Sequence, residues 1–167
     1  MVETEAPVLE SFTGGRWFAG TGNRVDVPSA VDGRVVARVS SDGVDFGAAV
    51  RFARGVGGPA LRALTFHARA ALLKDVASYL QQHKAELYEV SFDTGATLRD
   101  HYVDVDGGIG TLFSYASKGR RELPDEGFVL EGGLEPLGKR GTFVARHLLT
   151  SLHGVAVHIN AYNFPVW

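Results

Sequence analysis

The sequence predicts a fold of the α/β class, because strand-like segments near both ends enclose a long stretch with helical spacing. Residues 11–40 and 142–159 are rich in β-branched residues and are divided by glycines, as short strands joined by tight turns are. Between them, apolar residues recur three and four positions apart, as on the buried face of an amphipathic helix. Of the 167 residues, 45% are hydrophobic, so a globular core is expected and disorder is not.

The first elements are expected to be short strands followed by one short helix. Glycines at positions 14–15 and 33 separate the strand-like runs. Asp42 or Asp45 can cap a helix whose apolar residues are Phe46, Ala49, Val50 and Ala53. Residues that disfavour a helix follow and are expected to end it, namely Gly55, Gly57, Gly58 and Pro59.

A longer helix is expected to begin after Thr65, which can cap it. One face of this helix is expected to be buried, because it carries an apolar stripe made of Phe66, Ala70, Leu73, Val76, Ala77 and Leu80. His83 and Lys84 mark a join, after which helical spacing continues to Thr94, and Gly95 can supply a left-handed cap.

A third helical stretch is expected over residues 98–117. It contains three glycines, at positions 107, 108 and 110. Each costs about 1 kcal/mol relative to alanine inside a helix, so we expect them where another backbone packs closely.

The remainder of the chain is expected to return to strands. Residues 122–141 predict a loop with one short strand at 128–130. Strands are expected to follow at 142–149, beginning with Thr142, and at 155–159. The second is continuously apolar, as is typical of a strand in a sheet that is covered on both faces.

Charge and composition argue against several classes of protein. The 17 Lys and Arg residues nearly balance 19 Asp and Glu and are scattered, so no nucleic-acid partner is expected. No apolar run is long enough to cross a bilayer, and Glu3, Glu5 and Glu10 stand where a signal peptide needs positive charge. A cytoplasmic location without a membrane partner is therefore expected. The chain has no cysteine, which excludes disulfides, thiolate metal sites and a cysteine nucleophile within it.

Two clusters of polar residues have ordinary structural explanations. Asp100, Asp104 and Asp106 lie near His101 but lack the spacing of metal ligands. On a helix only Asp100 and Asp104 share a face, and this face is expected to be in contact with water. His147 and His158 fall in predicted strands, where a partly buried imidazole is more common than a catalytic one. No metal site and no histidine role are assigned.

The segment at residues 159–165 differs from these, because it places an amide side chain just after a predicted strand. Asn163 could donate a hydrogen bond into a cleft at the end of that strand. The alternative is an asparagine that satisfies the backbone of a turn, and spacing alone favours this alternative.

The order of motifs resembles the aldehyde dehydrogenase superfamily. Asn163-Phe164-Pro165 is similar to the end of the family motif Pro-Trp-Asn-Phe-Pro, with Ala161-Tyr162 in place of Pro-Trp. Four earlier segments also resemble family motifs in order: 14–17 (Asn-Gly-x-Trp, here with Gly14 first), 45–54 (Asp-x-x-x-Ala-Val), 69–86 (Arg-x-x-x-Leu) and 94–96 (Thr-Gly-Lys, here with Ala96 last). The resemblance covers nearly all of residues 11–167 and rests on this combined order.

The resemblance implies a specific chemistry. In this family a cysteine thiolate attacks the aldehyde, the oxyanion is held by the motif asparagine and a backbone N–H, hydride passes to NAD or NADP, and water releases the acid. Asn163 matches that asparagine. The resemblance also implies that the backbone of Ile159, Asn160, Ala161 and Tyr162 runs along the cofactor. The departures at Ala161 and Tyr162 put contacts at those two positions in doubt.

The resemblance further implies that residues 1–167 are a truncated amino-terminal region of an aldehyde dehydrogenase domain. This region would contain the early strands, the helical layer, a hairpin near residues 142–151 that helps join subunits into a homo-oligomer, and the start of the cofactor-domain sheet. It is expected to be inactive alone, because the nucleophilic cysteine and the glutamate base would lie in later sequence.

A narrower resemblance points to dehydrogenases that oxidise a CoA-linked semialdehyde in phenylacetate catabolism. It rests on three runs, at residues 59–66, 104–117 and 145–151. One alternative is the related semialdehyde dehydrogenase of the benzoyl-CoA epoxidation pathway, which shares the Asp-Gly-Gly-Ile stretch. The other is a non-catalytic helical interaction module that retains the ancestral sequence.

Overall fold

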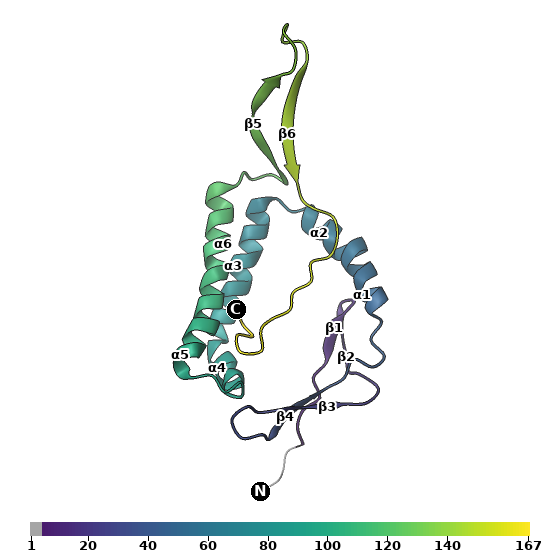
Figure 1. Cartoon of the computed structure of the whole chain (residues 1–167), viewed down its shortest axis with the longest axis vertical. Coiled ribbons are helices and arrows are strands. Elements are labelled where there is room, and N and C mark those ends of the chain that lie inside the picture. Colours follow the sequence, from purple (N-terminus) through teal and green to yellow (C-terminus); the bar gives the residue numbers. More distant parts are fainter. Residues whose placement is uncertain (1–4) are drawn as a thin grey trace.

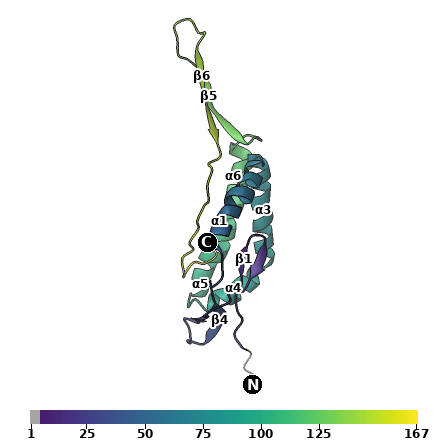
Figure 2. The same cartoon turned by 90° about the vertical axis from the view of Figure 1, so that its right-hand side faces the viewer.

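The structure is a computed structural model that describes residues 5–167. Glu3, which was used above as an argument against a signal peptide, lies outside the described residues. Two long helices form an upright body, small two-stranded sheets lie near the amino-terminal end, and a hairpin projects from the opposite end (Figure 1). The side view shows the same hairpin standing clear of the helices (Figure 2). In the part of the chain described, no helix is both long and apolar enough to span a bilayer.

The amino-terminal strands pair as two separate antiparallel hairpins. β1 (Ser11–Thr13) pairs with β2 (Arg16–Phe18), and β3 (Val25–Pro28) pairs with β4 (Val35–Val39). Gly14 and Gly15 connect β1 to β2 with φ values of 58° and 82°, as a two-residue hairpin turn requires. The expected strands and the glycine turn between them are confirmed.

The first helix begins as expected but does not end at its glycines. Asp45 caps α1 (Phe46–Phe52) by accepting a hydrogen bond of 2.7 Å from the backbone N–H of Ala48. The helical path then continues through a wider π-helical turn, η1 (Ala53–Gly57), into α2 (Gly58–Arg62). The expected stop was wrong: Pro59 is the second residue of α2 and directly follows the wider turn η1, so the hydrogen bond that it cannot donate falls at the junction of the two segments.

The second helix begins and ends close to the expected positions. Thr65 caps α3 (Phe66–Gln82) by accepting a 3.1 Å hydrogen bond from Ala68, and α4 (Lys84–Phe92) follows after the join at His83. Gly95 adopts φ +79°, which confirms the left-handed cap.

The third helical stretch is continuous, as expected, and forms the core with α3. It consists of α5 (Leu98–His101), a π-helical turn η2 (Tyr102–Asp106) and α6 (Gly107–Glu122). Both views show α3 and α6 side by side. The buried apolar residues of this pair are Ala70, Ala77, Val105, Ile109 and Ala116. Leu73 and Val76 of the predicted stripe remain exposed, because no described element covers that part of α3.

The carboxyl-terminal half differs most from the expectation. β5 (Phe128–Pro136) is three times as long as the predicted strand of three residues, and it pairs with β6 (Val144–Thr150) in an antiparallel hairpin. Residues 155–159 form no strand, although their sequence is strand-like. A strand needs a hydrogen-bonded neighbour, and residues 5–167 supply none to this segment, so it stays extended and exposed.

Candidate functional site

Asn163 lies at the tip of a tight turn near the carboxyl-terminal end of the chain. The backbone N–H of Phe164 donates to the carbonyl of Ala161 at 3.3 Å, which leaves Tyr162 and Asn163 at the two central positions. Both side chains are exposed, Tyr162 to 98%. Within residues 5–167, the amide of Asn163 takes part in no hydrogen bond. It is therefore available to a ligand from the solvent side.

A different asparagine stabilises this turn. The side-chain amide of Asn160 donates a 2.7 Å hydrogen bond to the carbonyl oxygen of Pro165, across the base of the turn. The sequence alone favoured Asn163 as the side chain that bonds to the backbone of the turn. In the structure Asn160 makes this hydrogen bond instead.

The turn is attached to the helical body through Asp104 on η2. One carboxylate oxygen of Asp104 accepts from the backbone N–H of Val166 at 3.1 Å and from that of Trp167 at 2.7 Å. The other oxygen lies 3.2 Å from the same N–H of Val166. Asp104 is only 3% exposed, so the expectation of a water-facing carboxylate was wrong. Its burial is compensated by these charge-assisted hydrogen bonds.

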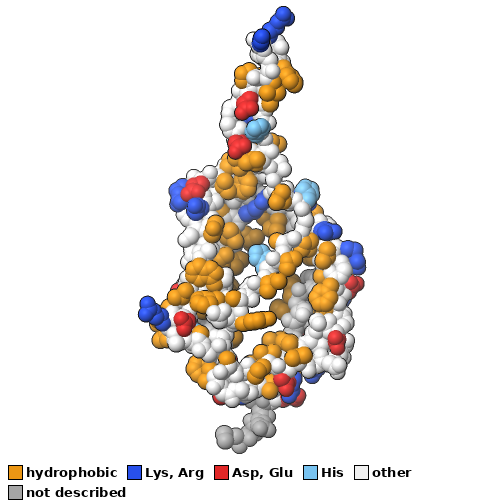
Figure 3. Space-filling view, in the orientation of Figure 1, with side chains coloured by type: hydrophobic (Ala, Val, Ile, Leu, Met, Phe, Trp, Pro, Cys, Tyr) orange, Lys and Arg blue, Asp and Glu red, His pale blue; other side chains and the backbone are white. Residues whose placement is uncertain are grey.

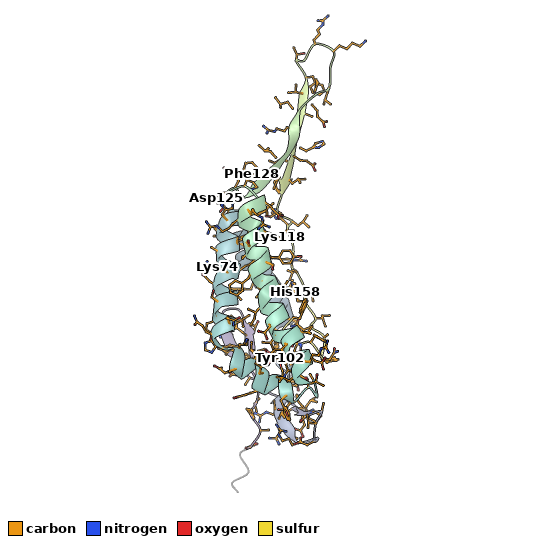
Figure 4. All side chains as sticks on the ribbon, turned by 90° about the vertical axis from the view of Figure 1, so that its left-hand side faces the viewer. Lys74, Tyr102, Lys118, Asp125, Phe128 and His158 are labelled. Carbon is orange, nitrogen blue, oxygen red and sulfur yellow. The ribbon has the colours of Figure 1, made fainter. Side chains whose placement is uncertain are left out.

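The glycines of α6 make room for this attachment. A Cβ atom at Gly108 would lie 3.0 Å from the Cα of Trp167, and one at Gly107 would overlap the Trp167 ring. Close backbone approach is therefore confirmed at Gly108, whereas Gly110 has no neighbour within 4 Å at its Cβ position. The carboxyl-terminal end lies beside α6 (Figure 1), and His158 lies along the helix pair between the levels of Lys118 and Tyr102 (Figure 4).

A second polar cluster joins α4 to η2 below the attachment point. Lys84 Nζ lies 2.8 Å from Asp106 Oδ1, and the hydroxyl of Tyr88 donates to Asp106 Oδ2. These two donors lower the pKa of Asp106 below its ordinary value. Burial, and then the hydrogen bond to Asp106, raise the pKa of Tyr88, so its hydroxyl stays a donor at neutral pH. The cluster therefore links α4 to η2.

The histidines do not form a site, but their surroundings differ from the expectation. His147 and His158 are exposed, and Nδ1 of His147 lies 3.6 Å from Glu131 across the hairpin. They were expected to be partly buried, but the hairpin and the extended segment have no covering layer among the described residues. His101 is instead 5% exposed and stacks on Tyr88. No group of three or more His, Cys, Asp or Glu side chains in residues 5–167 is arranged to hold a metal ion.

Ile159 and Asn160 are exposed and lead into the turn, whereas Ala161 and Tyr162 are exposed residues of the turn itself. Ile159 is 91% exposed, and in the described chain the backbone of residues 155–160 makes no hydrogen bond to other backbone groups. Asn160 and Asp104 are the two turn-holding residues that the sequence analysis did not identify. The partners of Asp104 lie 62 and 63 positions away, so no local pattern could indicate them.

Sequence comparison matches the chain to known proteins over most of its length. The profile described as the aldehyde dehydrogenase family matches residues 17–167. The curated 3,4-dehydroadipyl-CoA semialdehyde dehydrogenase of Aromatoleum evansii is 44% identical over 160 residues, which are 95% of this chain and 31% of the relative. The chain thus spans about a third of the length of the curated relative it matches.

Solved structures show the same fold. Lactaldehyde dehydrogenase from Escherichia coli has a TM-score of 0.63 at 15% identity, over 77% of this chain and 26% of that one. Aldehyde dehydrogenase 21 from Physcomitrella patens has a TM-score of 0.67 at 20% identity, over 83% of this chain and 28% of that one. At these identities the likeness concerns the fold alone.

Proposed function

Because the chain belongs to the aldehyde dehydrogenase family, we propose that it supplies the amino-terminal part of an NAD(P)-dependent dehydrogenase that oxidises a CoA-linked semialdehyde to the acid. The 44% identity to a 3,4-dehydroadipyl-CoA semialdehyde dehydrogenase supports this substrate class. Since residues 1–167 contain no cysteine, the thiolate nucleophile must come from other residues, and the chain alone is inactive.

In this proposal Asn163 is the oxyanion donor. Its amide is exposed at the tip of the turn and has no other partner in the described chain, so it can donate to an oxygen that becomes negative when the carbonyl is attacked. Asn160 and Asp104 hold the backbone that follows Asn163, so the turn does not need the Asn163 amide and that amide stays free to donate.

NAD or NADP would accept the hydride in this reaction. The residues proposed to lie along the cofactor are Ile159, Asn160, Ala161 and Tyr162. All four residues are exposed, and the backbone of Ile159 and Asn160 makes no hydrogen bond to other backbone groups of the described chain, which leaves it open to a molecule that lies beside it. Their part is to bind and orient, while the proton transfers belong to other residues of the complete enzyme.

The proposed pathway is phenylacetate catabolism, with the benzoyl-CoA epoxidation pathway as the alternative. Both supply a CoA-linked semialdehyde, so the substrate class is common to the two. The run at residues 145–151 supports the first. To distinguish the two pathways, kcat/KM is measured with the CoA-linked semialdehyde of each, and the higher value indicates the pathway.

The proposal is tested with a chimera in which this chain replaces the matching part of the Aromatoleum evansii relative. We expect aldehyde-dependent reduction of NAD or NADP by the chimera with a CoA-linked semialdehyde. The isolated chain is expected to show none, because it cannot form the covalent thiohemiacetal. Turnover that scales with purified isolated chain, or a folded chimera without turnover, would contradict the proposal.

A further inference from the structure

We propose that Asp104 is a positioning residue that fixes the Asn163 turn in place, an inference that rests on the proposed function. Asp104 is buried on η2, and its carboxylate accepts the backbone N–H groups of Val166 and Trp167 at 2.7–3.2 Å. Those two residues follow Asn163 by three and four positions. A carboxylate is seldom buried without such partners, and its hydrogen bonds to N–H donors are stronger than those between neutral groups.

The link between Asp104 and Asn163 is short and stiff. Only Phe164 and Pro165 separate Asn163 from the anchored N–H of Val166, and proline restricts its own φ to near −65°. The side-chain amide of Asn160, which precedes the turn, also donates to the carbonyl of Pro165 at 2.7 Å and so ties the two ends of the turn together. A shift at Val166 is therefore transmitted to the amide of Asn163 instead of being absorbed by a flexible linker.

Gly108 contributes to the same attachment independently of Asp104, because it leaves room for the backbone of Val166 and Trp167. A Cβ at this position would lie 3.0 Å from Trp167 Cα and 3.2 Å from both Trp167 N and Val166 O. Contacts that short require the anchored backbone to move. Gly110 lies two positions further along α6 with open space at its Cβ, so the same substitution there leaves the turn undisturbed.

The first test measures the fluorescence emission of Trp167 in the 167-residue chain. All variants also carry Trp17→Phe, so that Trp167 is the only tryptophan. Asp104→Ala and Gly108→Ala are each expected to shift Trp167 emission to longer wavelength and to increase its quenching by acrylamide. Asp104→Asn is expected to fall between wild type and Asp104→Ala, because an amide oxygen can still accept both N–H groups.

Two matched controls separate positioning from general damage to the fold. Asp106→Asn removes a nearby carboxylate that bonds Lys84 and Tyr88, and Gly110→Ala repeats the glycine substitution in open space. Both are expected to leave Trp167 emission unchanged. If they shift it as much as Asp104→Ala, or if Asp104→Ala keeps the wild-type spectrum, the anchoring role is wrong.

The second test measures kinetics in the chimera. Displacement of a group by about 1 Å can lower a rate by about 100-fold, so we expect Asp104→Ala to lower kcat roughly 10- to 100-fold with little change in KM. Asp104→Asn should recover part of this loss. A changed Trp167 spectrum with wild-type kcat would overturn the positioning role. A wild-type chimera without activity would instead refute the proposed function, and the emission series would still decide the anchoring.

Discussion

At the scale of single residues, two asparagines three positions apart have different roles in the turn: one stabilises it and the other is free to bind a ligand. Asn160 uses its amide on the backbone of Pro165, whereas the amide of Asn163 is exposed and unbonded among residues 5–167. A side chain that already satisfies a turn carbonyl is poorly placed to stabilise a developing charge elsewhere. This division makes Asn163 the better candidate for the oxyanion donor.

Replacing Asn163 by alanine in the chimera is expected to lower kcat by about 10² to 10³, roughly 3 to 4 kcal/mol, with a smaller effect on KM. The reason is that an oxyanion donor interacts most strongly when charge has developed on oxygen. Asn163→Asp should be at least as harmful, because a carboxylate repels the oxyanion. Steady-state kinetics test this, with circular dichroism to confirm folding. Nearly wild-type kcat in a folded Asn163→Ala variant would show that Asn163 is not the oxyanion donor.

Asp106 should make stability depend on acidic pH. Its pKa is held below the ordinary value of 3.8 by the hydrogen bonds from Lys84 and Tyr88. A carboxyl with a lowered pKa in the folded state stabilises the fold above its unfolded pKa, and this contribution disappears as pH falls through the folded pKa. The urea midpoint of the chain should therefore be constant well above pH 3.8, drop as pH falls through 3.8 and below it, and drop less in Asp106→Asn.

Urea unfolding followed by circular dichroism checks this dependence. Glu89→Gln, which neutralises an exposed carboxylate on α4, serves as the control, and its urea midpoint should fall with pH as in wild type. If the urea midpoint falls equally with pH in wild type and in Asp106→Asn, Asp106 does not cause the acid sensitivity.

At the scale of elements, the β5–β6 hairpin stands out because it is long and has no neighbour. A two-stranded hairpin alone in water is marginally stable, and both of its edges are unpaired among the described residues. Leu134, Phe143 and Leu148 are exposed on or beside it. These features favour the proposal that the hairpin packs against a second subunit.

Replacing Phe143 and Leu148 together by serine in the chimera is expected to reduce its oligomeric state. The change removes apolar area from the proposed interface while leaving the hairpin backbone free to pair. Light scattering after size-exclusion chromatography measures the mass. Phe46→Ser, an equally exposed aromatic position on α1, is the control and should keep the oligomer. An unchanged mass in the double variant would exclude this hairpin as the interface.

At the scale of the whole molecule, a large share of the apolar surface is uncovered. Figure 3 shows hydrophobic side chains spread over the body and along the hairpin. Leu152, Val157 and Ile159 on the extended segment are each at least 80% exposed. Exposed apolar patches of this kind mark surfaces that bury themselves against other protein. The chain spans 31% of the length of its curated relative.

The isolated chain is therefore expected to associate or aggregate. Extended backbone without a partner and exposed apolar side chains both favour contact between copies. Light scattering over a range of concentrations measures this, and replacement of Leu152, Val157 and Ile159 by serine should weaken it. A mass that stays that of the monomer at every concentration would contradict the expectation.

The sequence by itself determined the features that depend on neighbouring residues. The caps at Asp45 and Thr65, the glycine turn after β1 and the left-handed Gly95 are local, because each depends on a few positions along the chain. The family resemblance was equally readable, since it rests on the order of short motifs, and the family match confirms it.

Only the tertiary structure decided the features that join distant positions. The sequence placed Asp104 in water, yet its partners lie 62 and 63 residues further on and bury it. The sequence likewise predicted a strand at residues 155–159, which needs a hydrogen-bonded neighbour that residues 5–167 do not provide. Local propensity states what a segment can form, whereas burial and strand pairing depend on which distant groups reach it, and those groups are set by the packing of the whole chain.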